Sequence, residues 1–307
     1  IFYFSLGEGR VGAPLMTDLV RRTRSLLDSI GRSRGRPYTF VVHVTDSPRT
    51  SLELGLDVAT WLEEGLVDVL VVGMGYTQYV LKLAEWLDLA GPSGVPVYPS
   101  INTNAHGGQW MKLSDGPVYH EALRAASAYY WQEGANGIYL FNLFDQRTIR
   151  DNKEKPAYMY SEDPVYIHVP LSDIGDPATL LGKDKLYAIQ PVADRGRHQQ
   201  GCEAAPLPIA LDLNEHVLPL EMGPDAASPQ ASARIRALTT PTDGARIWMR
   251  LNNKLLNTSQ DGRWCEAEVP AGVLRPGRNS LAVWCDRDPV NTPRPVILSR
   301  VFVPVTY

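Results

Sequence analysis

The sequence feature that most constrains the fold is the segment at residues 121–145, EALRAASAYYWQEGANGIYLFNLFD. An amphipathic helix pattern is followed by a Gly-Ala-Asn-Gly turn and then by an apolar run that ends near Asn142 and Asp145. Because this run does not alternate with polar residues, it predicts a strand buried on both faces, which is typical of a parallel sheet covered by helices. Polar residues at the C-terminal end of such a strand lie where parallel β/α folds place their active sites.

Three similar units precede this segment. We expect strands at residues 38–45, 67–73, 95–102 and 137–144, and helices at residues 15–30, 51–65, 79–89 and 121–133. Strands that recur about every 30 residues with helices between them predict βαβ units and a parallel sheet. The pattern fits a doubly wound sheet or part of an eight-stranded barrel. No Gly-rich phosphate loop follows an expected strand, which disfavours a nucleotide-binding fold.

The pattern changes after residue 206. Short strand-like runs separated by turn residues such as Asp243-Gly244 and Asp261-Gly262 predict a β-sandwich or jelly roll. Residues 190–206 are polar and irregular and predict a linker, so the expected domains are 1–189 and 207–307. This part contains Trp248, Trp264 and Trp284. Trp248 and Trp284 lie inside strand patterns, so core packing is expected, with sugar binding by exposed Trp on one sheet as the alternative.

Composition excludes several partners. The 307 residues carry a formal net charge of −4, which gives no general attraction to nucleic acid or to an anionic membrane. No apolar run is long enough to span a bilayer. The three cysteines show no metal-ligand spacing, and we expect neither a metal nor a cofactor. Cys265 and Cys285 are interpreted as unpaired core thiols, with a pairing between them as the alternative.

Several stretches resemble a known family. RGRPYTFVVHVTDSP, GLDVATWLEEGLVDVLVVG and EGANGIYLFNLF, with GDPATLLGKDKLYAI as a closing helix region, resemble a bacterial glycoside hydrolase-like (β/α)8-barrel protein. The resemblance covers residues 2–189, with a looser β-sandwich match over residues 206–307. It implies an α/β fold with a partial (β/α)8 TIM-type barrel of about four β/α units, the fifth to eighth. An all-β sandwich or jelly-roll domain would follow, and the first half of the barrel would precede Ile1.

The resemblance implies a carbohydrate-active enzyme that hydrolyses a poly- or oligosaccharide at the C-terminal rim of the barrel. Barrel glycosidases use a pair of carboxylates, yet the third expected strand ends in SINTNAHGGQW without an acidic residue. The alternative is therefore a non-catalytic glycan-binding protein with a degenerate site. A lyase or a metal-dependent hydrolase is a third possibility, which the lack of paired His and acidic ligands disfavours. A polysaccharide-acting protein would be secreted or periplasmic; the oligomeric state is left open.

Two carboxylates are the candidate catalytic groups. Asp46 follows the first expected strand and Asp145 follows the fourth, so both are expected on the rim, where a carboxylate can act as a general acid or base. The alternative for Asp46 is a turn-capping role in Asp46-Ser47-Pro48.

The candidate substrate-binding residues are polar or aromatic side chains at expected strand ends or in the loops beside them. Amide and imidazole groups can bond sugar hydroxyls, and aromatic faces can pack on sugar rings. The alternatives are a buried histidine within the first strand and solvated loops elsewhere. The candidates are His43, Tyr76, Asn102, Asn104, His106, Trp110, Asn142 and Glu8.

Overall fold

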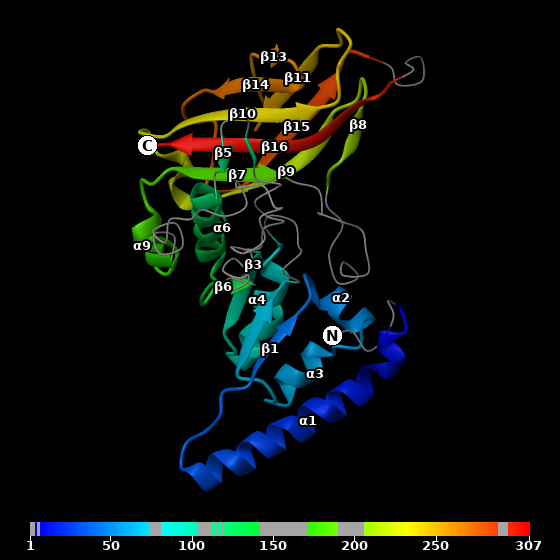
Figure 1. The fold of residues 1–307 in the computed structure, drawn as a ribbon, viewed down its shortest axis with the longest axis vertical. Coiled ribbons are helices and arrows are strands. Elements are labelled where there is room, and N and C mark those ends of the chain that lie inside the picture. The colour runs from blue at the N-terminus through cyan, green and yellow to red at the C-terminus, as the bar shows by residue number, and fades with distance from the viewer. Residues whose placement is uncertain are drawn as a thin grey trace, which may run out of the picture.

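The structure, a computed structural model, describes residues 4, 7–73, 81–102, 112–113, 116–117, 119–141, 171–189, 206–287 and 294–307. Helices and parallel strands alternate in the N-terminal part (Figure 1). Its elements are α1 (Gly9–Arg34), β1 (Val41–Val44), α2 (Pro48–Glu53), α3 (Val58–Glu63), β2 (Val69–Val72), α4 (Ala84–Ala90), η1 (Gly91–Ser93), β3 (Val97–Asn102), β4 (Lys112–Leu113), β5 (Gly116–Pro117), α6 (Tyr119–Glu133), β6 (Tyr139–Phe141) and α9 (Pro177–Leu180).

The helix expected at residues 51–65 is two short helices. Ser47 caps α2 by accepting a hydrogen bond from the Thr50 backbone, and Asp57 caps α3. Between them Gly55 has a φ of +86°, a backbone conformation that glycine adopts without strain. A helix cannot continue through such a residue, so the chain turns there.

Strands β1, β2, β3 and β6 form a parallel sheet in that order. Alternate residues of each strand face the helices, where Val44, Leu70 and Val97 pack in one buried cluster with Trp61 of α3 and Trp86 of α4. The helices α1, α3, α4 and α6 all contribute to this cluster, so they cover one face of the sheet. Trp61 and Trp86 are both buried there.

The prediction of a partial (β/α)8 barrel is wrong. The described parallel strands form one open sheet of four, and the next described strand after β6 is β7 (Lys185–Ile189), which pairs antiparallel with β16. Residues 185–189, expected in a closing helix region, are therefore a strand of another sheet. A repeat of helices and buried strands is common to every parallel sheet covered by helices, so the sequence pattern could not separate a barrel segment from this arrangement.

The C-terminal part consists of two antiparallel sheets. One has the order β13-β14-β10-β16-β7, with β8 paired to β16, and the other has the order β12-β11-β15-β9. Side chains such as Ile235, Met249 and Val283 from the two sheets share one buried core. The strands are β8 (Ile209–Leu211), β9 (His216–Met222), β10 (Ser232–Thr239), β11 (Ile247–Leu251), β12 (Lys254–Leu255), β13 (Ser259–Asp261), β14 (Trp264–Val269), β15 (Gly277–Cys285) and β16 (Val296–Thr306), with η4 (Pro224–Ala227) after β9.

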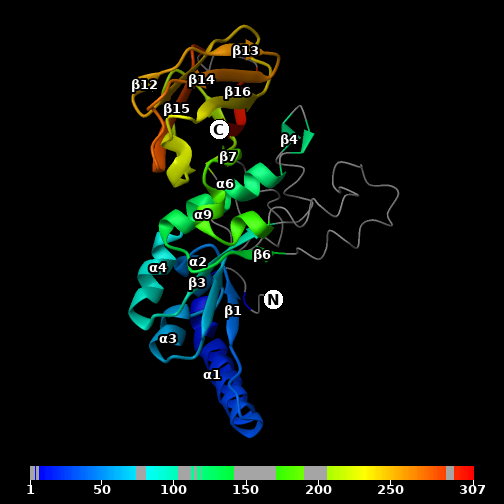
Figure 2. The same ribbon diagram turned by 90° about the vertical axis from the view of Figure 1, so that its left-hand side faces the viewer.

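Helix α6 lies between the parallel sheet and the antiparallel sheets (Figures 1 and 2). Ala126 packs in the core of the parallel sheet, Ala125 in the core of the antiparallel sheets, and Ala122 against Leu186 and Phe302. These small side chains let the backbone of α6 approach both parts closely. The approach is tight enough that a Cβ atom on Gly223 would lie 2.7 Å from the Ala128 Cβ.

For the antiparallel sheets, the prediction for the cysteines is confirmed and the prediction for the tryptophans is wrong. Cys265 and Cys285 are both free and buried, as the unpaired-thiol interpretation requires. Trp264 is half-buried and packs against the cluster that contains Leu186 and Phe302. Trp248 and Trp284 are half-buried rather than core residues. They stand opposite each other on β11 and β15 with stacked rings, and Arg246 lies over the Trp248 ring and Arg250 over the Trp284 ring. The burial pattern of β11 alternates, which places Trp248 on the outer face of the sheet.

Candidate functional site

The candidate site is the face of the parallel sheet opposite the helices of the core cluster. Residues paired across parallel strands point to the same face, so the register places His43 of β1 on the face that carries Tyr98 and Ser100 of β3. Tyr139, which pairs with Ser100, and Phe141 continue this face on β6. None of these five residues belongs to the helix-covered core cluster.

This face is concave. His43 and Tyr139 lie on the first and last strands of the sheet order, yet their ring centroids are 5.2 Å apart, and those of His43 and Phe141 are 5.8 Å apart. Three strand spacings of a flat sheet would separate the two edge strands by about 14 Å. The sheet must therefore curl toward His43 and Tyr139, and we call this surface the concave face.

His43 is fixed in one tautomer. Its Nε2 lies 2.5 Å from the carbonyl oxygen of Gly73, and because a carbonyl only accepts, Nε2 carries the proton and donates it. The Nδ1 atom is then the acceptor of the neutral ring. Desolvation by packed neighbours lowers the pKa of His43 below its ordinary value of 6.5, and the hydrogen bond to Gly73 opposes that shift only in part.

Ser100 adds an unsatisfied hydroxyl to the concave face. Its side chain is buried, and Oγ has no hydrogen-bond partner among the described residues. Gly73 lies beside it with a φ of +106°, and a Cβ atom on Gly73 would lie 3.5 Å from the Ser100 Cβ. A buried hydroxyl without a partner costs free energy, so its retention needs a reason such as a bound water or ligand.

Asp46 follows β1 as expected, but its side chain is 2 % exposed. Its backbone carbonyl accepts a hydrogen bond of 3.1 Å from the Trp86 indole. Desolvation raises the pKa of Tyr130, and the negative charge of Asp46 adds to that shift. Asp46 is thus held among α4 and α6 side chains, and a substrate would reach its carboxylate only after some rearrangement.

The turn after Asp46 is built from buried hydroxyl groups. The Thr45 hydroxyl lies 2.6 Å from that of Thr50 and 2.7 Å from that of Ser51, and Ser47 caps α2. These groups satisfy one another within the turn. The alternative interpretation gave Asp46 a turn-capping role in Asp46-Ser47-Pro48, whereas the helix cap in this turn is Ser47, with Pro48 at the first position of α2.

Of the other predicted site residues, the structure describes Glu8 and the backbone of Asn102. Glu8 is exposed at the start of α1, beside the end of α2, where the Gly7 amide donates to the Glu53 carbonyl. Asn102 ends β3, and only its backbone is described. The remaining candidates lie outside the described residues and stay predictions: Tyr76, Asn104, His106, Trp110, Asn142 and Asp145.

Sequence reasoning missed Tyr98, Ser100, Tyr139 and Phe141. The apolar run at residues 137–144 predicts a strand buried on both faces, which would place its aromatic residues in the core. The available signal was the two-residue periodicity, which places Tyr139 and Phe141 on one face of β6 and Leu140 on the other. The exposed fraction of Tyr139 is 39 %, and this shows that the face is open to solvent there.

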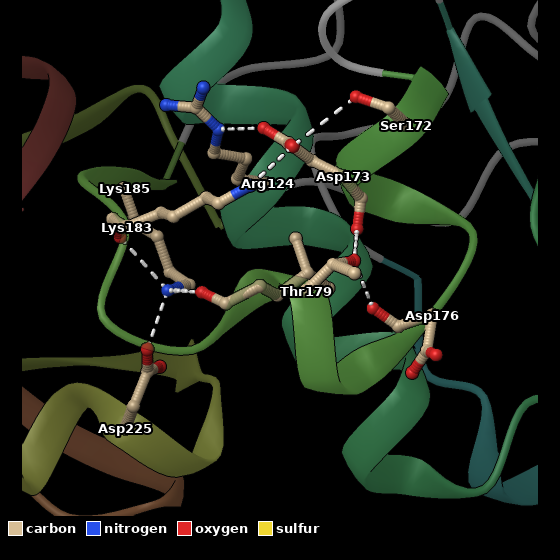
Figure 3. Close-up of polar contacts among 9 residues, drawn as sticks. Arg124, Ser172, Asp173, Asp176, Thr179, Lys183, Lys185 and Asp225 are labelled. Atoms are coloured by element: carbon tan, nitrogen blue, oxygen red, sulfur yellow. Dashed lines mark hydrogen bonds and ion pairs between the residues drawn. The ribbon is translucent and has the colours of Figure 1, made fainter.

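A second polar cluster joins α6 and α9 to the antiparallel sheets (Figure 3). The Lys185 side chain is fully buried, and its Nζ donates to Asp225 Oδ2 and the Leu180 carbonyl at 2.6 Å and to the Lys183 carbonyl at 3.0 Å. Burial lowers the pKa of Lys185, and the hydrogen bond to Asp225 opposes this. All three ammonium donors have acceptors, so Lys185 fixes structure and is not available as a nucleophile.

Asp173 completes this cluster. It accepts hydrogen bonds from Arg124 Nε at 2.8 Å and from Lys183 Nζ. Burial raises the pKa of Asp173, but the hydrogen bonds from Lys183 and Arg124 outweigh it and leave that pKa below its ordinary value. We refer to Arg124, Asp173, Lys183, Lys185 and Asp225 as the junction cluster.

The described residues hold no group of three or more His, Cys, Asp or Glu side chains arranged to bind a metal ion. Within the same part of the chain no helix is long and apolar enough to cross a membrane. No protein-family model matches the sequence, and no curated protein matches it. The site must therefore be interpreted from its own geometry.

Proposed function

We propose that the protein binds a carbohydrate on the concave face of the parallel sheet and acts on it as a glycoside hydrolase-like enzyme. The observation that carries the proposal is the pair of Tyr139 and Phe141, whose ring centroids lie within 6 Å of the His43 ring, with Tyr139 39 % exposed to solvent. Aromatic rings offer flat apolar surfaces on which the C–H groups of a sugar ring pack. The sequence resemblance to glycoside hydrolase-like proteins points to the same substrate class.

The polar groups on this face suit a polyhydroxylated ligand. His43 donates through Nε2 to the protein, so its Nδ1 can accept a hydrogen bond from a sugar hydroxyl. The Ser100 hydroxyl has no partner among the described residues and can either donate or accept, but at 1 % exposure it meets a ligand only after some rearrangement. An apolar platform with a few convergent polar groups is the usual form of a small-molecule site.

A second candidate function is glycan binding without hydrolysis. Glycosidic cleavage needs a proton donor and a second group that stabilises the positive charge at the anomeric carbon. Where the ends of the parallel strands are described, Asp46 is the one carboxylate that follows a strand, and its side chain is buried. This burial favours the binding function unless Asp145, beyond the described residues, supplies a catalytic carboxylate.

Two measurements on the same panel of soluble oligosaccharides test the proposal. Binding is measured by calorimetry, and product release is measured by chromatography. Tyr139→Ala should weaken binding about tenfold because it removes an aromatic platform. Val41→Ala is the matched control, since Val41 lies on the same face of β1, is 49 % exposed, and makes no ring contact with His43 in the described structure.

The outcomes separate the two functions. Product release that is lost in Asp46→Asn or Asp145→Asn with binding retained supports hydrolysis and assigns the acid. Binding without product release in the wild-type chain supports the glycan-binding function. No binding to any oligosaccharide, or equal binding by the Tyr139→Ala variant and wild type, would contradict carbohydrate binding at the concave face.

A further inference from the structure

Helix α1 carries a row of exposed apolar side chains that no described residue covers. Figures 1 and 2 show α1 at the end of the molecule farthest from the antiparallel sheets. Large apolar side chains on its outer side remain exposed, at fractions from 87 % for Val11 to 41 % for Ile30. We call these residues and the arginine among them the α1 stripe: Val11, Leu15, Leu19, Arg22, Leu26 and Ile30.

The stripe is a continuous surface. At 100° per residue its six positions fall within about 100° of the helix circumference and extend along about 28 Å of the axis. The opposite side of α1 is buried, with Ala13, Thr17 and Val20 directed to the protein. Thr17 accepts a hydrogen bond from the Trp61 indole, and Arg24 pairs with Asp68, so the inner side of the helix is anchored. The outer side has no such role within the described chain.

The spacing of the stripe residues along the sequence is symmetric about the middle of the stripe. Successive positions differ by 4, 4, 3, 4 and 4 residues. When two copies of α1 pair antiparallel, each stripe residue therefore meets a stripe residue of the partner: Val11 meets Ile30, Leu15 meets Leu26 and Leu19 meets Arg22. A two-fold symmetric interface requires self-complementarity of this kind. Neither a parallel pair nor an unrelated apolar partner needs it.

The charges of the stripe are also self-complementary. Arg22 forms an ion pair of 2.8 Å with Asp18 on the same helix, and their side chains are 79 % and 51 % exposed. In the antiparallel register each Arg22 also comes beside the partner's Asp18, so four charges alternate in sign around the two-fold axis. Like charges at the axis would instead oppose pairing.

We propose that two copies of this chain associate through α1, antiparallel, with Leu15 of one copy opposite Leu26 of the other. A contact between two single helices is small for a specific interface, so we expect a weak dimer with a dissociation constant of about micromolar or above. The stripe lies on the side of α1 that faces away from the parallel sheet, so association leaves the concave face uncovered. This inference is independent of the proposed carbohydrate ligand.

Mixed cysteine cross-linking tests the register. Leu15→Cys and Leu26→Cys are made separately in a Cys202→Ser background. The native cysteines that remain, Cys265 and Cys285, are both buried. Within either variant alone the two engineered thiols are about 16 Å apart along the helix axes, whereas in the mixture they lie opposite each other. We expect a disulfide-linked dimer in the mixture only. Cross-linking of either variant alone would contradict the antiparallel register.

Charge exchange tests the interface in solution, with the dimer dissociation constant measured by sedimentation equilibrium. Arg22→Asp puts four carboxylates at the axis, and Asp18→Arg puts four guanidinium groups there, so each should weaken the dimer about tenfold. The double exchange restores alternation and should restore association. Circular dichroism checks that the helix is retained. A chain that stays monomeric at about 1 mM, far above the dissociation constants of weak interfaces, would overturn the proposal.

Discussion

The junction cluster and the concave face are both polar regions beside the same helix-covered core, and they differ in how their polar atoms are satisfied. In the junction cluster Lys185 has three acceptors and Asp173 has two cationic donors. On the concave face Ser100 has no partner among the described residues, and His43 is bonded on one nitrogen only within that part of the chain. Asp225 Oδ1 also lacks a partner among the described residues, so the contrast lies in the nitrogen-bearing groups: Lys185 is fully bonded and holds elements together, whereas Nδ1 of His43 stays available to a ligand.

The largest effect that would test this contrast is on stability. Asp225→Ala leaves the buried Lys185 ammonium without its carboxylate, and we expect the free energy of unfolding to fall by about 3–5 kcal/mol. Asp261→Ala, at an exposed position of β13, is the control and should change it by about 0.5 kcal/mol or less. Urea denaturation measures both. A loss below about 1 kcal/mol for Asp225→Ala would mean that Lys185 does not depend on this pairing.

The second prediction concerns acid. The pKa of Asp173 in the folded protein lies below its ordinary value of 3.8. Its stabilising contribution is therefore complete above the unfolded-state pKa and is lost as the pH falls through the lower folded-state pKa. Asp173→Asn should lose about 1–3 kcal/mol of stability at neutral pH and should show a smaller further loss on acidification than wild type. Parallel acid dependence in the two proteins would show that other carboxylates dominate.

The third prediction applies to the concave face. Because the pKa of His43 is lowered below 6.5, the imidazole is neutral at pH 7 and Nδ1 is an acceptor. Protonation as the pH falls through the folded-state pKa makes Nδ1 a donor, so carbohydrate affinity should fall about three- to tenfold in that range. His43→Gln should bind more weakly at neutral pH and lose the pH dependence. If His43→Gln retains the wild-type pH profile, the titrating group is another residue.

The smallest expected effect is that of removing the unsatisfied Ser100 hydroxyl. Ser100→Ala removes a buried hydroxyl without a partner, so stability should stay the same or rise by about 0.5 kcal/mol, while carbohydrate affinity falls about threefold. Ser127→Ala is a matched control, because Ser127 Oγ is also buried and unpartnered among the described residues but lies on α6. The control should match the effect on stability and leave affinity unchanged. Equal affinities of the two variants would argue against a ligand contact at Ser100.

Much of the parallel sheet could be predicted from the sequence. The four apolar runs coincide with β1, β2, β3 and β6 to within a few residues, because burial on a sheet leaves a strong local pattern. The curl of the sheet and the pairing of β7 with β16 could not be predicted in this way. Both depend on contacts between residues far apart in the chain, which leave no local periodicity.

In the candidate site, too, features with a local sequence pattern were predictable and features that depend on tertiary packing were not. The position of Asp46 after a strand was predictable, but the burial of its carboxylate depends on how α4 and α6 pack. The run that contains Tyr139 predicts burial on both faces, because a run without alternation gives no sign of which face stays open, yet Tyr139 is 39 % exposed. Trp248 and Trp284 were misplaced for a related reason, since a strand interior in sequence can still face solvent on an outer sheet surface.

Helix α6 has a consequence for folding cooperativity. Its alanines belong to the cores of both sheet systems, and β7, which follows it in the chain, is an edge strand of the larger antiparallel sheet. Removing everything before residue 206 would strip β7 from β16 and expose a long unpaired strand edge. The two parts should therefore unfold in one transition, and a protease that cuts α6 should release neither of them as a stable fragment.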